Sequence, residues 1–143
     1  MQDYQTLIAE HDRLDGFAIN MMAIVAGPRN PDGAIAARAT LSIDLEDHLS
    51  REDSFLYDRL LDKEGDAFSQ AVGAFHRDFA NLTRDWVDYL RGWDADRVTA
   101  DWSSFAQDTL SIMHRLRERI AAENDLLYPL ALERGHIRLR AAA

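Results

Sequence analysis

Apolar residues recur along the chain at alternating intervals of three and four positions. Because an α-helix has about 3.6 residues per turn, this spacing gathers the apolar side chains on one face of a helix. Glycine and proline, which interrupt helices, concentrate in three segments: 27–33, 63–66 and 92–96. The pattern therefore predicts four helices and a short C-terminal tail. We expect the helices at about 3–26, 34–63, 66–91 and 97–128.

The connections between these helices are short, and short connections favour neighbouring helices that run in opposite directions. No stretch shows the strict apolar and polar alternation that is typical of strands. A chain of 143 residues has the usual length of one domain. We therefore expect an all-α fold, an antiparallel up-down-up-down four-helix bundle, as a single domain over residues 1–143. The residues after Gly135 are expected to form a loosely held end.

Ionisable residues interrupt the apolar faces of the first three helices, and burying them is costly unless they are hydrogen-bonded, paired or bound to metal. His48 and Glu52 are four residues apart, so they share one helix face. His11 and His76 stand in or beside the apolar faces of the first and third helices. Counted from the loops, His11 is about as deep as His48, and Glu52 about as deep as His76. We therefore expect each of these two pairs to meet across an antiparallel hairpin.

Histidine nitrogen and carboxylate oxygen form a ligand set that suits iron, manganese or zinc. The chain has no cysteine, which excludes disulfides, thiolate zinc sites and iron–sulfur clusters. A single buried histidine is more often a hydrogen-bonded core residue than a ligand. The matched depths of four ionisable residues favour a metal site or a polar network derived from one.

The net charge is −9. Nucleic acids and anionic membranes attract proteins of the opposite sign, so neither is expected as a partner. The most apolar stretch, 17–26, is far shorter than the roughly 20 residues that span a bilayer. The N-terminal residues lack the pattern of a secretory signal, and a cytoplasmic location is expected.

Four segments of the chain resemble the ligand segments of the hemerythrin family and its bacterial HHE relatives, in helix order and over nearly the whole chain. These segments are Glu10–Leu14, His48–Tyr57, Phe75–Phe79 and Glu123–Pro129. The resemblance implies a four-helix bundle that holds a non-heme di-iron centre with five histidines and two carboxylates.

Carried over to this chain, the resemblance implies five metal ligands: His11, His48, Glu52, His76 and Glu123. Glu52 would be able to bridge two ions. The chain departs from the family in two places: the third helix offers one histidine instead of two, and Arg119 stands where the fourth helix usually carries a histidine. A guanidinium cannot ligate a metal because it keeps its proton. Arg119 would pair with Glu123, either inside the bundle or as a surface ion pair.

The expected function is non-heme iron binding in oxygen, redox or iron sensing, with one iron ion, two or none, and with dioxygen as a candidate ligand. No phosphate-binding loop, nucleophile elbow or HExxH motif is present, so no catalytic residues are predicted. An enzyme remains an alternative because an open iron position can activate oxygen or peroxide. A second alternative is a metal-free regulatory or interaction bundle. Aromatic residues around the third loop either cap the core or form a homodimer interface.

Overall fold

The computed structural model describes residues 3–52, 67–79 and 81–140, and these residues are almost entirely helical. No strand occurs among them, which confirms the all-α fold class. The elements are α1 (Tyr4–Ala26), α2 (Pro31–Arg51), α4 (Ala67–Phe79), α5 (Asn81–Gly92), α6 (Ala95–Ala100), α7 (Trp102–Ala122), the π-helical turn η2 (Glu123–Leu127) and α8 (Tyr128–Glu133).

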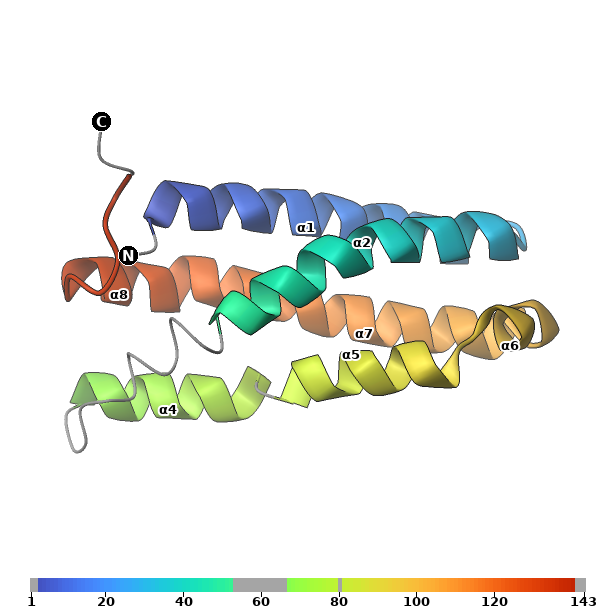
Figure 1. The fold of residues 1–143 in the computed structure, drawn as a ribbon. Coiled ribbons are helices and arrows are strands. Elements are labelled where there is room, and N and C mark those ends of the chain that lie inside the picture. The colour runs from blue at the N-terminus through green and yellow to red at the C-terminus, as the bar shows by residue number, and fades with distance from the viewer. Residues whose placement is uncertain (1–2, 53–66, 80, 141–143) are drawn as a thin grey trace.

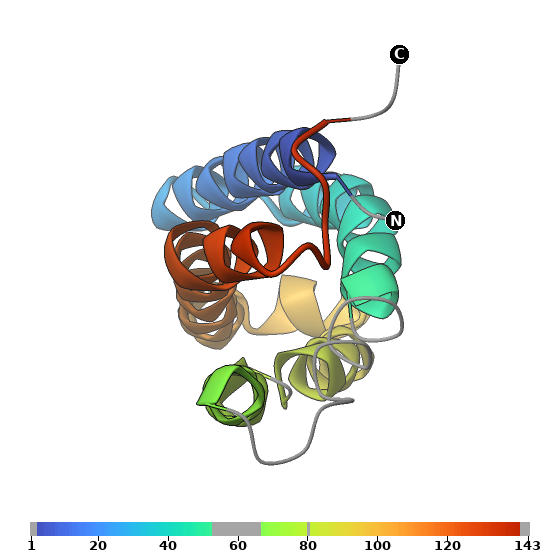
Figure 2. The ribbon, with the colours of Figure 1, turned by 90° about the vertical axis from the view of Figure 1, so that its left-hand side faces the viewer.

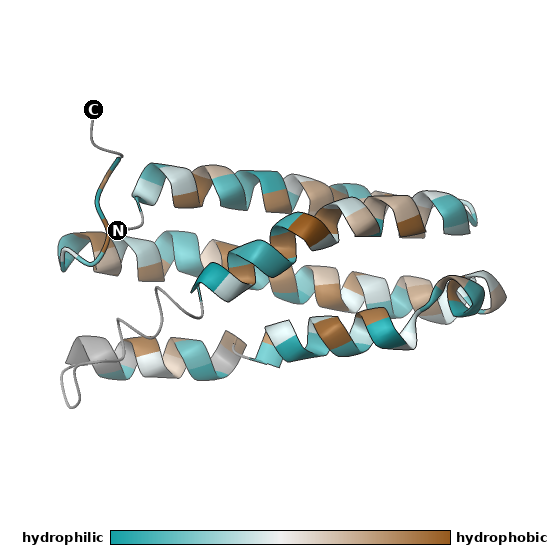
Figure 3. Ribbon diagram, in the orientation of Figure 1, coloured by the Kyte–Doolittle hydropathy of each residue, from teal (hydrophilic) through white to brown (hydrophobic). Residues whose placement is uncertain are grey.

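The long helices lie side by side with similar axis directions (Figure 1). The end-on view shows them surrounding a common interior (Figure 2). α1 packs against α2 and α7, and α5 packs against α7. Along each helix, brown apolar positions alternate with teal polar ones, as expected for helices with one buried face (Figure 3).

The boundaries of the first two helices are set by capping side chains. Asp3 accepts a hydrogen bond from the backbone N–H of Thr6 at 2.8 Å and begins α1. Asn30 accepts one from Gly33 at 3.1 Å and begins α2 three residues earlier than predicted. Pro31 fits the first turn of a helix, where its missing N–H costs nothing. A Cβ on Gly33 would lie 2.2 Å from Asn30 Nδ2, so the cap requires glycine there.

Each of the two later predicted helices corresponds to more than one described element. The predicted third helix is observed as α4 and α5, and residue 80 between them lies outside the described residues. The predicted fourth helix begins as α6, and the cap residue Asp101 then starts α7. It also continues past Pro129, which lies in the first turn of α8 after the π-helical turn. The predicted end of the second helix, 53–63, lies outside the described residues.

The apolar interior consists of two clusters. The larger one joins α1, α2, α5 and α7 and includes Leu14, Leu45, Trp86, Phe105 and Leu116. The smaller one contains Leu7, Val72, Leu127, Tyr128, Ala131 and Ile137. Four buried ionisable residues lie where the two clusters meet along α1 and α7. They are His11, His48, Arg119 and Glu123, and each is 0–3 % exposed. A buried polar layer therefore separates the two apolar parts.

The aromatic residues around the third loop belong to the core. Trp86, Tyr89 and Trp93 are 1 %, 9 % and 4 % exposed and lie in the larger cluster, and Trp102 packs against it. Capping of the core therefore accounts for these residues. No helix in the described ranges combines the length and the apolarity needed to cross a bilayer.

The expectation of a loosely held C-terminal end is wrong for residues 136–140. Ile137 is 2 % exposed and packs in the smaller cluster. The backbone N–H groups of Tyr4 and Gln5 donate to the carbonyls of Arg138 and Leu139 at 2.7 and 3.1 Å. These N–H groups in the first turn of α1 have no partner within the helix, so the tail satisfies them.

Replacing Ile137 with alanine should therefore lower the free energy of unfolding by about 2–5 kcal/mol, because the change leaves a cavity in the smaller cluster. Urea denaturation followed by circular dichroism measures this loss. Leu139, which is 54 % exposed on the same tail, provides the matched control. Leu139→Ala should change the stability by less than about 0.5 kcal/mol. Equal losses in the two variants would contradict the packing of Ile137.

Candidate metal centre

His11 lies at the centre of the buried polar layer. Its Nε2 atom is 3.0 Å from His48 Nε2, 3.3 Å from Glu52 Oε1 and 3.1 Å from Glu123 Oε1. His48 Nε2 is in turn 2.6 Å from Glu52 Oε1. These four residues each offer one ligand atom, and the four atoms all lie within 4.8 Å of one another. Three segments of the chain, α1, the end of α2 and the start of η2, therefore converge on one point.

Helix periodicity explains the pairs on each segment. His48 and Glu52 are four residues apart, so both side chains leave α2 on the same face. Arg119 and Glu123 have the same spacing at the junction of α7 and η2. The expected meeting of His11 and His48 is confirmed by their 3.0 Å separation.

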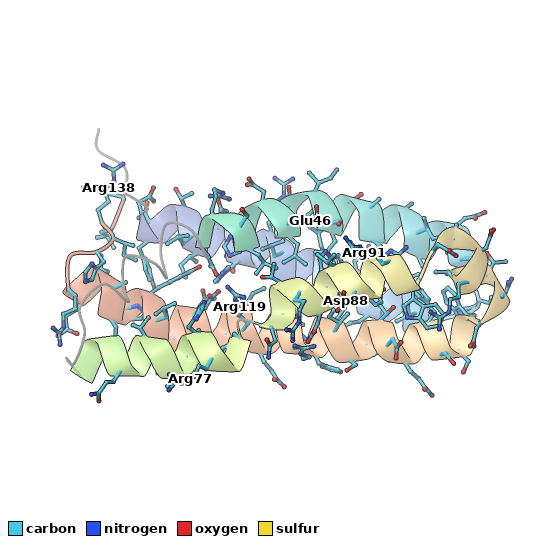
Figure 4. The ribbon with its side chains drawn as sticks, turned by 60° about the horizontal axis from the view of Figure 1, so that its bottom comes forward. Glu46, Arg77, Asp88, Arg91, Arg119 and Arg138 are labelled. Carbon is cyan, nitrogen blue, oxygen red and sulfur yellow. The ribbon has the colours of Figure 1, made fainter. Side chains whose placement is uncertain are left out.

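Arg119 lies inside the protein, with only 1 % of its surface exposed. Its Nη2 donates to Glu52 Oε2 at 3.0 Å and its Nε donates to Glu123 Oε2 at 3.3 Å. Nη1 donates to the backbone carbonyl of Phe79 at 3.3 Å, which ties the end of α4 to the cluster. In Figure 4 the side chain of Arg119 points from α7 into the interior, whereas Arg77 on α4 points outward. The sequence left open whether Arg119 pairs with Glu123 inside the bundle or at the surface, and the structure shows the buried pair.

A second set of polar side chains holds the two histidine rings. His11 Nδ1 is 2.6 Å from Asn124 Oδ1, and His48 Nδ1 is 2.8 Å from Glu10 Oε2. Glu10 also accepts a hydrogen bond from Arg51 at 2.8 Å. Partners of this kind orient the imidazole, so that the opposite nitrogen, Nε2, faces the cluster. A pocket of about 180 Å³ between α1 and α2 is lined by His48, Glu10 and Arg51 and leads from the surface toward this ring.

The charges of the cluster shift the pKa values of its members strongly. Burial by itself lowers the pKa of His11, but hydrogen bonds and attraction from Glu123 and Glu52 outweigh it and raise the pKa to about 10. Burial likewise lowers the pKa of His48, and its bonds to Glu10 and Glu52 raise it to about 9. The buried carboxylates therefore favour the protonated form of both rings in the metal-free protein.

The two buried carboxyls respond in opposite directions. Burial raises the pKa of Glu52, but the hydrogen bonds and charges of the two histidines hold it well below its usual range. Burial and the negative charge of Glu52 raise the pKa of Glu123 to about 7, despite the attraction of Arg119. Two neighbouring carboxyls cannot both ionise easily, which explains the difference.

The donor atoms fit one small cation. Two ligands at right angles around an ion, with bonds of about 2.1 Å, lie about 3.0 Å apart. The separations of His11 Nε2 from its three neighbours in the cluster, 3.0 to 3.3 Å, match this spacing. The outer oxygens of Glu52 and Glu123 are engaged by Arg119, and a fixed positive charge there repels a second cation. The arrangement thus suits one metal ion rather than two.

The structure brings together four of the five predicted ligands. His76 is on α4, partly exposed, and among the described residues it does not belong to the group that converges on His11. The expected meeting of Glu52 and His76 is therefore not seen, and Glu52 instead contacts His11, His48 and Arg119. The comparison of depths counted residues from the loop at 63–66, which lies outside the described residues.

Sequence reasoning missed Tyr128, which is fully buried beside the cluster. Its hydroxyl lies 2.9 Å from His11 Nε2 and donates a hydrogen bond to Glu52 Oε1. Tyr128 follows Glu123 by five residues, a spacing that separates two side chains by about 140° on a regular α-helix. No signal in the apolar pattern indicated the π-helical turn that changes this angle.

The geometry defines a class of protein: an all-helical fold with a buried histidine and carboxylate cluster that could hold a metal ion. The family model of the hemerythrin HHE cation-binding domain matches residues 2–131. This match covers nearly the whole chain, and the protein belongs to that family. Comparisons with curated proteins and with solved structures found no match.

The pKa shifts predict that the metal-free protein loses stability as the pH rises from about 5 to 10. Glu123 has a folded pKa of about 7, above its usual 4.5, so its ionisation weakens the fold over that interval. His11 has a folded pKa of about 10, so its stabilising effect is complete below about pH 6.5 and is lost as the pH approaches 10. Urea denaturation at a series of pH values, with chelator present, should show a fall of at least about 2 kcal/mol.

His11→Gln should flatten this dependence because the substituted side chain does not titrate. His114, which is exposed on α7, supplies the matched control. His114→Gln should keep the slope of the parent protein. On the acidic side, the lowered pKa of Glu52 contributes stability that is complete above about pH 4.5 and is lost progressively as the pH falls below that value. Stability that stays constant between pH 5 and 9 would contradict the assignment of charges in the cluster.

Proposed function

We propose that this protein is a hemerythrin-like metal-binding protein that holds a single non-heme iron ion and acts in oxygen, redox or iron sensing. Its frame in this proposal is an antiparallel up-down-up-down four-helix bundle. The observation that carries the proposal is the convergence of two histidine nitrogens and two carboxylate oxygens within 4.8 Å, all buried. The proposed ligands are His11, His48, Glu52 and Glu123.

The choice of iron follows from the family and from the donor set. Mixed nitrogen and oxygen ligands without thiolate suit iron, manganese and zinc, and the family resemblance favours iron. Iron would supply the redox chemistry and the affinity for dioxygen that the side chains of the cluster lack. His76 is left out of the proposed set because it lies apart from the four converging residues, and its predicted role as a ligand stays a prediction.

The residues of the chain prepare the site in three ways. Glu10 and Asn124 hold the two imidazole rings with Nε2 facing inward. The apolar clusters on both sides exclude water, which strengthens the electrostatic interactions of the cluster. Arg119 occupies the outer carboxylate oxygens and restricts the site to one ion.

One observation favours a second candidate, a metal-free regulatory or interaction bundle. In the absence of metal, Arg119 and the two protonated histidines already neutralise Glu52 and Glu123 through hydrogen bonds. A fully paired network of this kind is stable without a cofactor. The two candidates differ in metal content and in the protons exchanged on adding metal.

Protein purified without chelator should contain about one equivalent of transition metal, mainly iron. His48→Ala should lose most of this metal, because the variant lacks a histidine ligand that Glu10 holds in place. Mass spectrometry of the metals after acid digestion measures both. His114→Ala is the matched control, since this exposed histidine stands away from the cluster. Iron and zinc contents that are unchanged in His48→Ala would disprove the proposed site. A parent protein that binds no added iron would favour the metal-free candidate.

Arg119→His should raise the metal content toward two equivalents, because the change removes the fixed charge, frees Glu52 and Glu123 and adds a ligand. Arg119→Ala removes the charge without adding a ligand and should destabilise the metal-free protein by about 3–5 kcal/mol, since the outer oxygens of two buried carboxylates lose their cation. Arg117, whose pair with Asp15 is at the surface, provides the control. Arg117→His should change the stability by less than about 1 kcal/mol and leave the metal content unaltered. A single equivalent in Arg119→His would contradict this account of Arg119.

A further inference from the structure

Tyr128 is a buried residue with a polar group that the ligand set above does not include. The residue is fully buried, and its hydroxyl group meets two of the ligand atoms. We propose that Tyr128 supplies a fifth donor to the ion, its phenolate oxygen, and that this donor makes the centre selective for ferric iron over divalent ions. The inference rests on the proposed function, since it requires a metal at this site.

The position of the hydroxyl fits that role. Tyr128 Oη lies 2.9 Å from His11 Nε2, a separation close to those between His11 and the other ligand atoms. It also contacts Glu52 Oε1, the oxygen of Glu52 that faces the two histidines. Its separation from His11 Nε2 thus matches the spacing of about 3.0 Å expected for neighbouring donors around one small cation.

The backbone supplies a second, independent reason. The N–H of Tyr128 bonds to the carbonyl of Glu123, five residues earlier, in the turn η2. A hydrogen bond between residues i and i+5 adds one residue to the turn, so residues five apart lie nearly above one another on the same face. Regular α-helix would separate them by about 140° and turn the phenol away from the cluster. The π-helical turn therefore brings Glu123 and Tyr128 to the same point, and such turns are frequent at functional sites.

The chemistry accounts for the selectivity. A phenol must lose its proton to bind, so the O–H bond breaks, the oxygen donates to the ion and the proton leaves to solvent water. An ordinary phenol has a pKa of about 10, and a more highly charged cation favours the anionic oxygen more strongly. Hard anionic oxygen also matches a hard trivalent ion better than a softer divalent one. Ferric iron is the trivalent form of the metal in the proposed function.

Another role for Tyr128 has to be separated from this one. In that other role, the hydroxyl would bind no metal and would orient Glu52 by donating a hydrogen bond to it. An orienting tyrosine would stay protonated when the metal binds, and it would produce no electronic transition between the phenol and iron. A phenolate bound to ferric iron produces a charge-transfer absorption band in the visible range. The spectrum of the loaded protein therefore distinguishes the two roles.

The experiment loads the full-length protein with ferric nitrilotriacetate, removes excess reagent and records iron content and visible absorption. The parent protein should be coloured, and Tyr128→Phe should lose the band per iron bound. The preference of the Tyr128→Phe variant for ferric over zinc ions, measured in competition, should fall at least about tenfold. This corresponds to a loss of roughly 1.4 kcal/mol of binding free energy for the missing donor. Tyr89→Phe is the matched control, because Tyr89 is also buried but bonds to Thr109 in the larger apolar cluster. Tyr4→Phe and Tyr57→Phe test the two remaining tyrosines, of which Tyr57 lies outside the described residues, and all three controls should keep the band.

Each result has one meaning. Iron bound by the parent protein without a band, or a band retained in Tyr128→Phe, overturns the role of Tyr128 and leaves the proposed function standing. A parent protein that binds no iron overturns both. Should Tyr128→Phe hold no iron, resonance Raman spectra of the iron-loaded parent protein and its three control variants, with ring-deuterated tyrosine, decide the matter. Phenolate modes that shift on deuteration and survive in all three controls support Tyr128, and their absence overturns it.

Discussion

The ion pairs between the Arg119 guanidinium and the carboxylates of Glu52 and Glu123 are the interaction on which the rest of the centre depends. Removing these charged groups from water is costly, and the charge-assisted hydrogen bonds from Arg119 to each carboxylate must offset that cost. Because Arg119 comes from α7, Glu52 from the end of α2 and the accepting carbonyl of Phe79 from α4, the same guanidinium also fixes three helices relative to one another. The architecture and the chemistry of the site therefore share one set of bonds.

The polar layer is stable because apolar clusters enclose it on both sides. Leu14 and Leu45 belong to the cluster on one side, and Leu7, Leu127 and Ile137 to that on the other. Exclusion of water strengthens each hydrogen bond in the layer and makes an unpaired group costly. The C-terminal tail, held by Ile137 and by bonds to the first turn of α1, completes the enclosure at that end.

The charge distribution makes the centre a place where protons and a metal ion compete. In the metal-free protein, the protonated rings of His11 and His48 supply the positive charge that the carboxylates require. A bound cation would replace those protons, so metal affinity and protonation are linked. Arg119 keeps its charge in either state, so a fixed positive charge stays beside Glu52 and Glu123 whether or not an ion is bound.

Much of this protein follows from its sequence. The repeat of apolar residues determines the all-α class, and the spacing of four residues determines that His48 and Glu52, and Arg119 and Glu123, share a face. Equal distances from a short loop were enough to pair His11 with His48. The tertiary structure alone decided the places of His76, Tyr128 and Ile137. Each depends on a local departure from regular helix or on contacts between segments distant in sequence, and a periodic pattern within one helix carries no information about either.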